Sequence, residues 1–246
     1  MKVIVIIPAA GLGTRMSAAP GGLKTKSKQF FELQGTPIVI HTLRKFAQCD
    51  AVGEIVVALR NAETPIFQKQ IERENFRKPL RVVEGGEHRQ NSVANAIAAL
   101  GAVDDDIVLV HDAVRPFVDQ ETIVNVIEAV KKYGAAIAGI PAVDTVKQVD
   151  RTADGAVVVA TVPRERMVLA QTPQGFRFGL LRQAFEEAQA DGFLGTDEAS
   201  VIERSGTPVH VVMGSARNLK ITTPADLELA EFFLSLEHRR EVSLSG

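Results

Sequence analysis

Short runs of β-branched residues alternate along this chain with segments that carry the hydrophobic period of a helix, and this alternation most constrains the fold. It predicts an α/β architecture: a doubly wound, mostly parallel sheet with helices on both faces. In this architecture, ligands bind beyond the carboxyl ends of the strands. The expected strands are Val3–Ile7, Glu54–Leu59, Leu80–Glu84, Asp106–His111, Ala135–Pro141 and Val209–Met213. The expected helices are Pro37–Ala47, Glu63–Glu74, Gln90–Leu100, Gln120–Tyr133, Phe178–Ala190 and Pro224–Glu237.

One segment, residues 143–163, breaks this alternation. Its sequence, VDTVKQVDRTADGAVVVATVP, alternates at period two around Asp154 and Gly155, which is a strong hairpin signal. A hairpin of this length cannot bury both faces alone, so we expect a protruding β-arm that lies on another surface, most simply that of a homodimer partner. With no internal repeat or low-complexity linker, the expected organisation is a single domain over residues 1–246 with this arm as an excursion.

Composition limits the kinds of ligand and partner that this chain is expected to bind. The chain has 246 residues, 46% of them apolar, and a formal net charge of -2 with both signs mixed. This balance argues against a whole-surface nucleic-acid or membrane binder, so local cations and small anionic ligands are expected instead. The sole cysteine, Cys49, suits a reducing compartment, and no export signal or apolar stretch of about 20 residues is present. A cytoplasmic location is therefore expected.

The first strand ends in the turn PAAGLGTRM, residues 8 to 16. Glycines after a strand let backbone N–H groups approach a phosphate, and a following helix start adds its dipole. The two standard phosphate-binding motifs, GxxxxGK[ST] and GxGxxG, both require glycine at the position where this chain has Met16. Neither a P-loop ATPase nor an ordinary dinucleotide binder is therefore supported. The turn alone is compatible with a bound anion or with a tight turn that has no ligand. Arg15 and the lysines that follow, up to Lys28, are either an anion-binding lid or a solvated basic loop.

The third expected strand ends in EGGEHRQNSV, with a helix expected to open near Asn91 or Ser92. Paired glycines at 85 and 86 let the backbone approach a flat ring closely. Ser92 is either a helix cap or a contact of a base or ribose. The neighbours Glu87 and His88 are weak evidence for a metal site.

The fourth expected strand ends in VHDAVRPF, which places Asp112 and Arg115 just past the sheet edge. A carboxylate there can orient a hydroxyl or a Mg²⁺-bound phosphate, and an Asp–Arg structural pair fits the same spacing. His111 is expected to pack in the fold rather than to act as a base.

Further cations come late in the chain, in VPRERMVLAQTPQGF and ARNLKITTPADL. The second of these places Lys220 before an expected helix start at Pro224. The strand ends thus gather cations, but no Ser-His-Asp set, Cys-His pair or metal cluster can be assembled from the sequence.

Taken together, these stretches closely resemble the 2-C-methyl-D-erythritol 4-phosphate cytidylyltransferase family of the non-mevalonate isoprenoid pathway. The resemblance runs from Val3 to about Leu234. Its motifs stand in family order as PAAGLGTRM, KQF, EGGEHRQNSV, VHDAVRPF, DTVK, AQTPQGF and NLKITTPADL. It implies a Rossmann-like nucleotidyltransferase fold, a homodimer joined by the arm, CTP bound with Mg²⁺, and release of diphosphate.

The resemblance also implies roles for residues. Those matching catalytic positions are Arg15, Lys28, Arg164 and Lys220, the first two as stabilisers of charge on the triphosphate. Those matching cytidine-nucleotide contacts are Ala9, Ala10, Gly11, Gly86 and Ser92. Those matching contacts of the sugar phosphate are Asp112, Arg115, Thr145 and Thr172. No protein ligand of the metal is implied.

Two alternatives remain at this stage. Cytidylyl transfer to another polyol phosphate, such as ribitol 5-phosphate, is the nearer one, because related enzymes share the glycine loop, HDxxRP and QTPQ. The opening PAAG and the DTVK of the arm favour methylerythritol phosphate. A catalytically silent nucleotide-binding protein is the other, and the retained Arg15, Lys28 and Lys220 argue against it.

Overall fold

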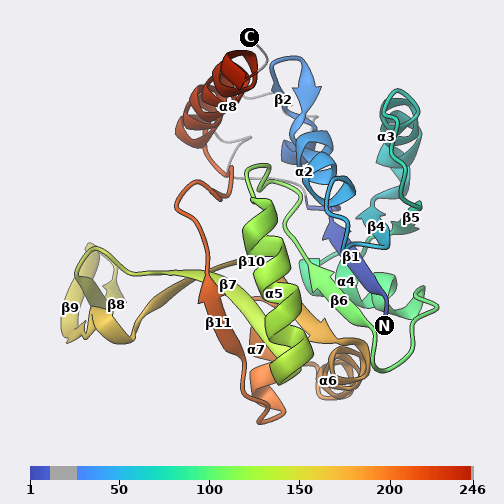
Figure 1. Cartoon of the computed structure of the whole chain (residues 1–246). Coiled ribbons are helices and arrows are strands. Elements are labelled where there is room, and N and C mark those ends of the chain that lie inside the picture. Colours follow the sequence, from blue (N-terminus) through green and yellow to red (C-terminus); the bar gives the residue numbers. More distant parts are fainter. Residues whose placement is uncertain (12–26, 245–246) are drawn as a thin grey trace.

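A seven-stranded sheet forms the centre of the computed structural model, which describes residues 1–11 and 27–244 (Figure 1). The strand order is β11-β7-β10-β6-β1-β4-β5. The strands are β1 (Val3–Pro8), β4 (Glu54–Leu59), β5 (Leu80–Glu84), β6 (Ile107–Val110), β7 (Ala135–Pro141), β10 (Val168–Arg177) and β11 (His210–Met213). All neighbours pair in parallel except β10, which is antiparallel to both β6 and β7. The expected mostly parallel sheet is confirmed.

Helices cover both faces of the sheet, as the sequence predicts. Side-chain alternation along β1 decides which residue supports which face: Val5 and Ile7 pack on one side, whereas Ile4 and Ile6 pack on the other. The first side carries α2 (Ile38–Ala47), α3 (Thr64–Ile71) and α5 (Gln120–Tyr133). The second carries α4 (Arg89–Ala98), α6 (Phe178–Ala190) and α7 (Glu198–Arg204). Every residue of β4 is buried, because neither face of the sheet is left open there.

Strand β10 is the one strand of the seven-stranded sheet that the sequence pattern does not predict, and helix α7 is also missing from the expected helices. The segment of β10, VLAQTPQGFR, carries a proline and several polar residues, which argue against a central strand. The pairing with β7 shifts between Ala170 and Gln174, so Pro173 lies in the irregular part of the ladder. Further on, a Cβ on Gly175 would lie 2.8 Å from Leu109, Val126 and Val130, so only glycine fits beneath α5.

A third, smaller apolar cluster lies beside the carboxyl ends of the strands. There α8 (Pro224–Leu244) packs through Ala230 and Leu234 onto the loop after β6 and onto a short hairpin. The hairpin is β2 (Glu32–Leu33) with β3 (Thr36–Pro37), and short 3-10 turns are η1 (Lys28–Phe30), η2 (Asn61–Glu63) and η3 (Arg164–Arg166). Within the described ranges, we find no helix with both the length and the apolar character that a membrane crossing requires.

The expected hairpin is confirmed as β8 (Val146–Thr152) paired antiparallel with β9 (Gly155–Val162). We call it the arm, and it projects away from the sheet on the side of β7 and β11 (Figure 1). Gly155 has φ of 142°, a conformation that favours glycine after the turn. Both faces of the arm are exposed in the single chain, including Val157, Val158 and Val159.

Candidate functional site

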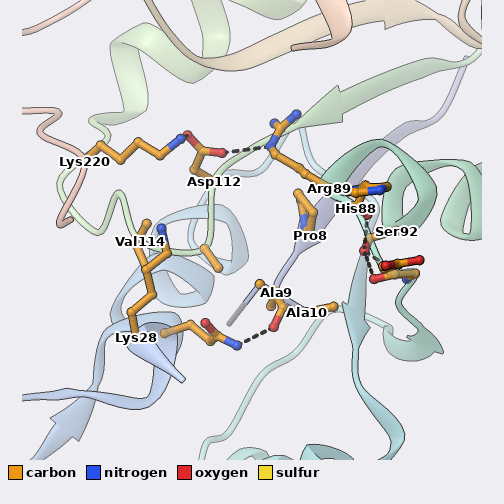
Figure 2. Close-up of a pocket in the computed structure, with 15 residues that line it drawn as sticks. Pro8, Ala9, Ala10, Lys28, His88, Arg89, Ser92, Asp112, Val114 and Lys220 are labelled. Atoms are coloured by element: carbon orange, nitrogen blue, oxygen red, sulfur yellow. Dashed lines mark hydrogen bonds and ion pairs between the residues drawn. The ribbon is translucent and has the colours of Figure 1, made fainter. Parts of the chain in front are cut away.

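A cleft lies where the sheet ends at the carboxyl side of β1, β5 and β6. A pocket of about 230 Å³ lies in this cleft, and Figure 2 shows its lining. Eight of the residues that the sequence singles out line it: Ala9, Ala10, Gly11, Lys28, Gly86, Ser92, Asp112 and Lys220. Residues from five separate stretches of the chain therefore meet at one sheet edge, as expected for a doubly wound fold.

A second pocket, of about 210 Å³, adjoins the first. The two share Arg89, Asp112 and Lys220 in their walls. Its further lining includes Arg115 and Thr172, both predicted from the sequence, and Gln174, Thr196 and Asp197, which were not. The shared wall makes the cleft a place where two ligands can lie in contact. We call the two parts the first and second pockets.

The turn after β1 is held by the neighbouring strand. The backbone N–H of Ala9 donates to the carbonyl of Ala58 at 2.8 Å, and the Gln29 side chain donates to the carbonyl of Ala9. Ala10 packs so closely on Gly85 that a Cβ on Gly85 would lie 2.3 Å from the Ala10 methyl. A Cβ on Gly11, in contrast, would meet no atom of residues 1–11 or 27–244 within 4 Å. The turn is thus fixed on its inner side and open towards the first pocket.

The loop after β5 differs from the sequence expectation in one respect. Helix α4 begins at Arg89, earlier than Asn91 or Ser92, because Asn91 Oδ1 accepts the backbone N–H of His88 at 3.2 Å. Ser92 is therefore not the cap. Its buried hydroxyl accepts the N–H of Gly86 at 3.0 Å and lies 3.1 Å from the carbonyl of His88. Ser92 consequently fixes the glycine backbone that faces the cleft.

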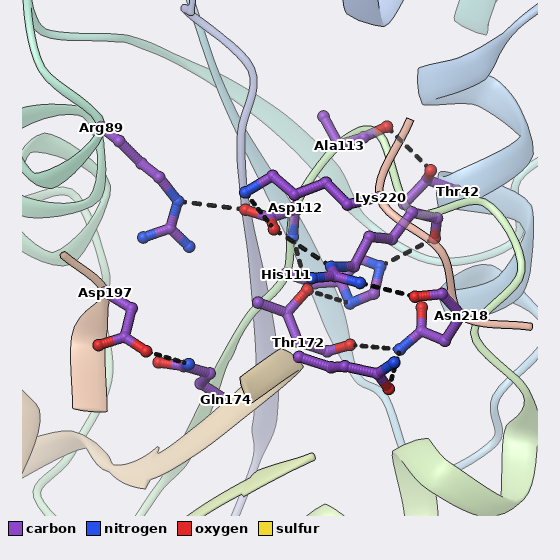
Figure 3. Close-up of polar contacts among 12 residues, drawn as sticks. Thr42, Arg89, His111, Asp112, Ala113, Thr172, Gln174, Asp197, Asn218 and Lys220 are labelled. Atoms are coloured by element: carbon purple, nitrogen blue, oxygen red, sulfur yellow. Dashed lines mark hydrogen bonds and ion pairs between the residues drawn. The ribbon is translucent and has the colours of Figure 1, made fainter. Parts of the chain in front are cut away.

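The buried carboxylate of Asp112 lies between three cationic side chains, of which Figures 2 and 3 label Arg89 and Lys220. Lys220 Nζ lies 2.9 Å from Oδ2, Arg115 Nε lies 3.3 Å from the same oxygen, and Arg89 Nε lies 3.2 Å from Oδ1. Burial by itself would raise the pKa of Asp112, but the charges of Arg89, Lys220 and Arg115 outweigh it and hold the pKa well below its usual range. The cluster has an excess of positive charge at the shared wall, which suits anionic ligands.

Backbone contacts bring Lys220 to this position. The N–H of Ile221 donates to the carbonyl of Val114 at 2.9 Å, and Ile221 is fully buried in the third apolar cluster. The adjacent Asn218 carbonyl accepts from Arg115 Nη1 at 2.6 Å. The loop that carries Lys220 is thereby fastened to the loop that carries Asp112.

His111 is buried beside Asp112 and packs in the fold, as expected from the sequence. Its Nε2 lies 3.0 Å from the carbonyl of Arg115, and its Nδ1 lies 3.1 Å from the Thr172 hydroxyl (Figure 3). A carbonyl can only accept, so Nε2 carries the proton and Nδ1 accepts from Thr172. The same Thr172 oxygen accepts the backbone N–H of Asp112 at 3.0 Å. Burial lowers the pKa of His111 to about 4, so this network uses the neutral imidazole.

This network predicts a pH-dependent stability. The unfolded chain protonates His111 near its ordinary pKa of 6.5, whereas the folded chain keeps it neutral to about 4. Protons therefore bind preferentially to the unfolded state, and the free energy of unfolding should fall by roughly 1 to 2 kcal/mol between pH 6.5 and 5 from this group. Urea unfolding of the wild type and of His111→Gln across this range tests it. An equal slope for both proteins would contradict the assignment.

Two of the expected site residues in the described part of the chain lie outside both pockets. Thr145 and Arg164 are exposed at the base of the arm, where Arg164 Nη1 donates to the carbonyl of Val143 at 2.8 Å. Neither lines the first or the second pocket. Arg15 lies outside the described residues. The arm residues can complete a cleft only if they reach that of another subunit.

The sequence did not predict Arg89, which lines both pockets, or Glu198, which contacts Arg89 from outside them. Arg89 stands in the quoted motif EGGEHRQNSV, but one arginine in a polar helix start gives no signal of its own. Glu198 stands in GTDEAS, which is typical of a helix N-terminus with exposed acidic residues. In the structure Glu198 is 1% exposed, and its Oε1 accepts from Arg89 Nη1 at 2.6 Å.

Comparisons with known proteins show the family and the fold to which the chain is similar. The family model described as 2-C-methyl-D-erythritol 4-phosphate cytidylyltransferase matches residues 3–236. The chain is 58% identical to the protein of that name from Acidobacterium capsulatum, over 95% of this chain and 98% of the relative. It is 52% identical to the one from Solibacter usitatus, over 98% of each chain. The crystal structure of the Francisella tularensis protein of that name matches with a TM-score of 0.78 and 38% identity, covering 94% of this chain and 99% of the other.

A second solved structure, 4-diphosphocytidyl-2C-methyl-D-erythritol synthase from Anaerococcus prevotii, matches with a TM-score of 0.80. It is 30% identical and covers 95% of this chain and 96% of the other. The fold, and not only the motifs, is therefore shared over nearly the whole chain.

Proposed function

Because this chain belongs to the 2-C-methyl-D-erythritol 4-phosphate cytidylyltransferase family, we propose that its cleft holds a nucleotide and a sugar phosphate side by side. The chain is a nucleotidyltransferase of isoprenoid biosynthesis. It transfers the cytidylyl group of CTP to 2-C-methyl-D-erythritol 4-phosphate and gives 4-diphosphocytidyl-2-C-methyl-D-erythritol and diphosphate. The observation that carries the placement is the wall of Arg89, Asp112 and Lys220 shared by two adjoining pockets, since transfer requires two anionic substrates in contact.

The first pocket is assigned to CTP. In this arrangement the open backbone at Gly11 faces the triphosphate, and Gly86, fixed by Ser92, faces the cytosine ring. Ala9 and Ala10 complete the wall between them. A base that enters here meets backbone atoms at short range, which favours a pyrimidine over the larger purines.

The second pocket is assigned to the sugar phosphate. Asp112 accepts a hydroxyl of the sugar alcohol, Thr172 and Arg115 shape the wall behind it, and Lys220 lies where the phosphate approaches the first pocket. Lys220 has an exposed fraction of 36%, so its ammonium can contact both Asp112 and an incoming phosphate oxygen.

The reaction needs no protein base. A phosphate monoester has a second pKa near 6 and is mostly a dianion at pH 7. One of its oxygens attacks the α-phosphorus of CTP, and the bond between that phosphorus and the bridging oxygen of diphosphate breaks. The protein supplies position and positive charge, which is where catalysis of phosphoryl transfer resides. Lys28 and Lys220 supply charge from the cleft, and Arg15 is assigned the same role from its place in the glycine turn.

Mg²⁺ fits this cleft as an ion carried by the nucleotide. Among residues 1–11 and 27–244, we find no group of three His, Cys, Asp or Glu side chains that could form a metal cage. Mg²⁺ commonly keeps its waters and binds through substrate phosphates with one or two carboxylates, so a cage is not required. Asp112 lines both pockets, but Arg89, Arg115 and Lys220 already contact its two oxygens, so the nucleotide phosphates and water would be the main ligands of the ion. Held in this way, the ion would neutralise charge on the phosphates.

The working unit is assigned as a homodimer of single-domain subunits. The arm exposes valines on both faces, and its basal residues Thr145 and Arg164 contact neither pocket of their own chain. A closed twofold pair accounts for both observations, since each arm then covers its apolar surface and brings these two residues to the sugar phosphate of the partner subunit.

A substrate assay tests the function. Purified protein with Mg²⁺ is expected to release diphosphate fastest with CTP and 2-C-methyl-D-erythritol 4-phosphate. Substituting ATP, GTP or UTP should lower kcat/KM by roughly tenfold or more, because a base that misses the backbone contacts leaves buried polar groups unpaired. Ribitol 5-phosphate serves as the matched acceptor. Equal use of ATP would contradict the nucleotide assignment, and preference for ribitol 5-phosphate would contradict the acceptor.

A further inference from the structure

Arg89 contacts two buried carboxylates that lie far apart in the sequence. Its Nε lies 3.2 Å from Asp112 Oδ1, at the end of β6, and its Nη1 lies 2.6 Å from Glu198 Oε1, at the start of α7. The side chain is 30% exposed, and it lines both pockets. Arg89 is therefore fixed between two anions while part of its guanidinium faces the cleft.

The burial of Glu198 calls for a specific cause. The side chain is 1% exposed, and its Oε2 has no hydrogen-bond partner among the described residues. Burial raises the pKa of Glu198 despite the opposing charge of Arg89, which shows how costly the ionised form is at this place. A glutamine of the same shape would avoid that cost if the position served packing alone. The Glu198 carboxylate lies 2.6 Å from Arg89 Nη1, so its charge acts directly on that guanidinium.

The start of α7 holds Glu198 rigidly. Asp197 Oδ1 accepts the N–H of Ser200 at 2.9 Å, which caps the helix. Gln174 of β10 donates to Asp197 Oδ2 at 2.8 Å (Figure 3). It also accepts the N–H of Ala199 at 2.9 Å. Strand β10 thus sets the position of the residues on both sides of Glu198.

We infer that Glu198 is a positioning residue that acts through Arg89 on Asp112. Glu198 contacts the guanidinium of Arg89 and fixes its position. That guanidinium contacts Oδ1 of Asp112, whereas Lys220 and Arg115 contact Oδ2. The chain of contacts orients the carboxylate that the proposed function assigns to the sugar alcohol, so the inference rests on that function. Arginine suits the place because its planar fork donates in two directions at once, whereas a lysine ammonium is a single point charge.

The experiment is a double-mutant cycle with the full-length protein. Glu198→Gln removes the charge and keeps the shape, and Arg89→Lys keeps the charge and removes the fork. Each single variant is expected to lower kcat/KM for 2-C-methyl-D-erythritol 4-phosphate by roughly tenfold to a hundredfold, as for a misplaced site group. The KM for CTP should change less than the KM for the sugar phosphate. The double variant should be no worse than Arg89→Lys alone, because both changes break the same chain of contacts.

Glu54→Gln is the matched control. Glu54 is also buried and also bonds two cations, Lys2 and Arg81, but it lies at the amino end of β4 and lines neither pocket. It should lower the melting temperature and leave both KM values within about twofold of the wild type. Glu198→Gln at a matched loss of melting temperature should differ from it in the KM for the sugar phosphate.

The outcomes are separable. Losses that multiply in the double variant, or a Glu198→Gln enzyme with the kinetics of Glu54→Gln, would overturn the inference and leave the proposed function intact. A wild-type protein that transfers no cytidylyl group to the sugar phosphate would overturn both.

Discussion

Replacement of Asp112 by asparagine (D112N) should lower cytidylyl transfer by roughly a hundredfold and destabilise the fold by about 3 kcal/mol. The carboxylate offsets the charges of Arg89, Arg115 and Lys220, two of which it holds through one oxygen. The amide of an asparagine cannot accept hydrogen bonds from all three of these cations. Its NH₂ group would also face one of them. Steady-state kinetics with both substrates and urea unfolding at pH 7 measure the two effects.

The effect on stability has a definite pH dependence. The folded-state pKa of Asp112 lies below its unfolded value, so its contribution is complete above about pH 4 and is lost as the pH falls towards the folded pKa. The gap in stability between the wild type and D112N should therefore close on acidification. Asp105→Asn is the control, because Asp105 pairs with Arg177 at 3.0 Å but is largely exposed. A D112N protein as active and stable as this control would refute the role of the cluster.

Mixing two inactive variants should restore activity if the arm completes the cleft of the partner subunit. Lys28 lines the first pocket, whereas Arg164 lies at the base of the arm and lines neither pocket of its own chain. Homodimers of Lys28→Ala and of Arg164→Ala should each lose roughly a hundredfold in kcat, as expected when a charge-assisted contact to the transition state is removed. A mixed dimer then holds one doubly damaged site and one intact site. Random re-pairing of equal amounts makes about half the dimers mixed, so roughly a quarter of wild-type activity should return.

The control for this mixing uses two pocket residues. Lys28→Ala mixed with Lys220→Ala damages both sites of every mixed dimer, because both residues line the first pocket of their own subunit. Activity should stay at the level of the parents. Tagging one variant confirms that subunits have exchanged. If tagged dimers of Lys28→Ala with Arg164→Ala form and remain inactive, Arg164 serves its own subunit.

Local patterns carry most of the fold and part of the site. The expected strands and helices recur with shifts of a few residues, the arm is confirmed, and the glycine turn, Gly86, Asp112 and Lys220 meet at the predicted sheet edge. These features are predictable because each depends on a short stretch: a β-branched run, a period-two alternation, or a polar residue directly after a strand. The roles of the individual residues at the site stay predictions.

What the sequence conceals depends on contacts between distant segments. Strand β10 reads as a loop because Pro173 stands inside it, and only its neighbours β6 and β7 make it a strand. Arg89 and Glu198 are separated by 109 positions in the chain, and each alone is typical of an exposed helix start. Their burial follows from the way α4 and α7 pack on the same face of the sheet, which no local pattern contains.

The position of β10 has a consequence for the order in which the chain can fold. Strands β6 and β7 are made before the arm, but they are not neighbours in the sheet, because β10 lies between them and is made after the arm. Until β10 leaves the ribosome, β6 and β7 each present an unpaired edge, and such edges associate readily with other chains. The middle of the sheet therefore closes late, by pairing between segments far apart in the chain, and such closure is slow. The strand that carries Thr172 and Gln174 into the cleft is also the one whose arrival joins β6 to β7, and the other edge of β7 is covered only when β11 follows.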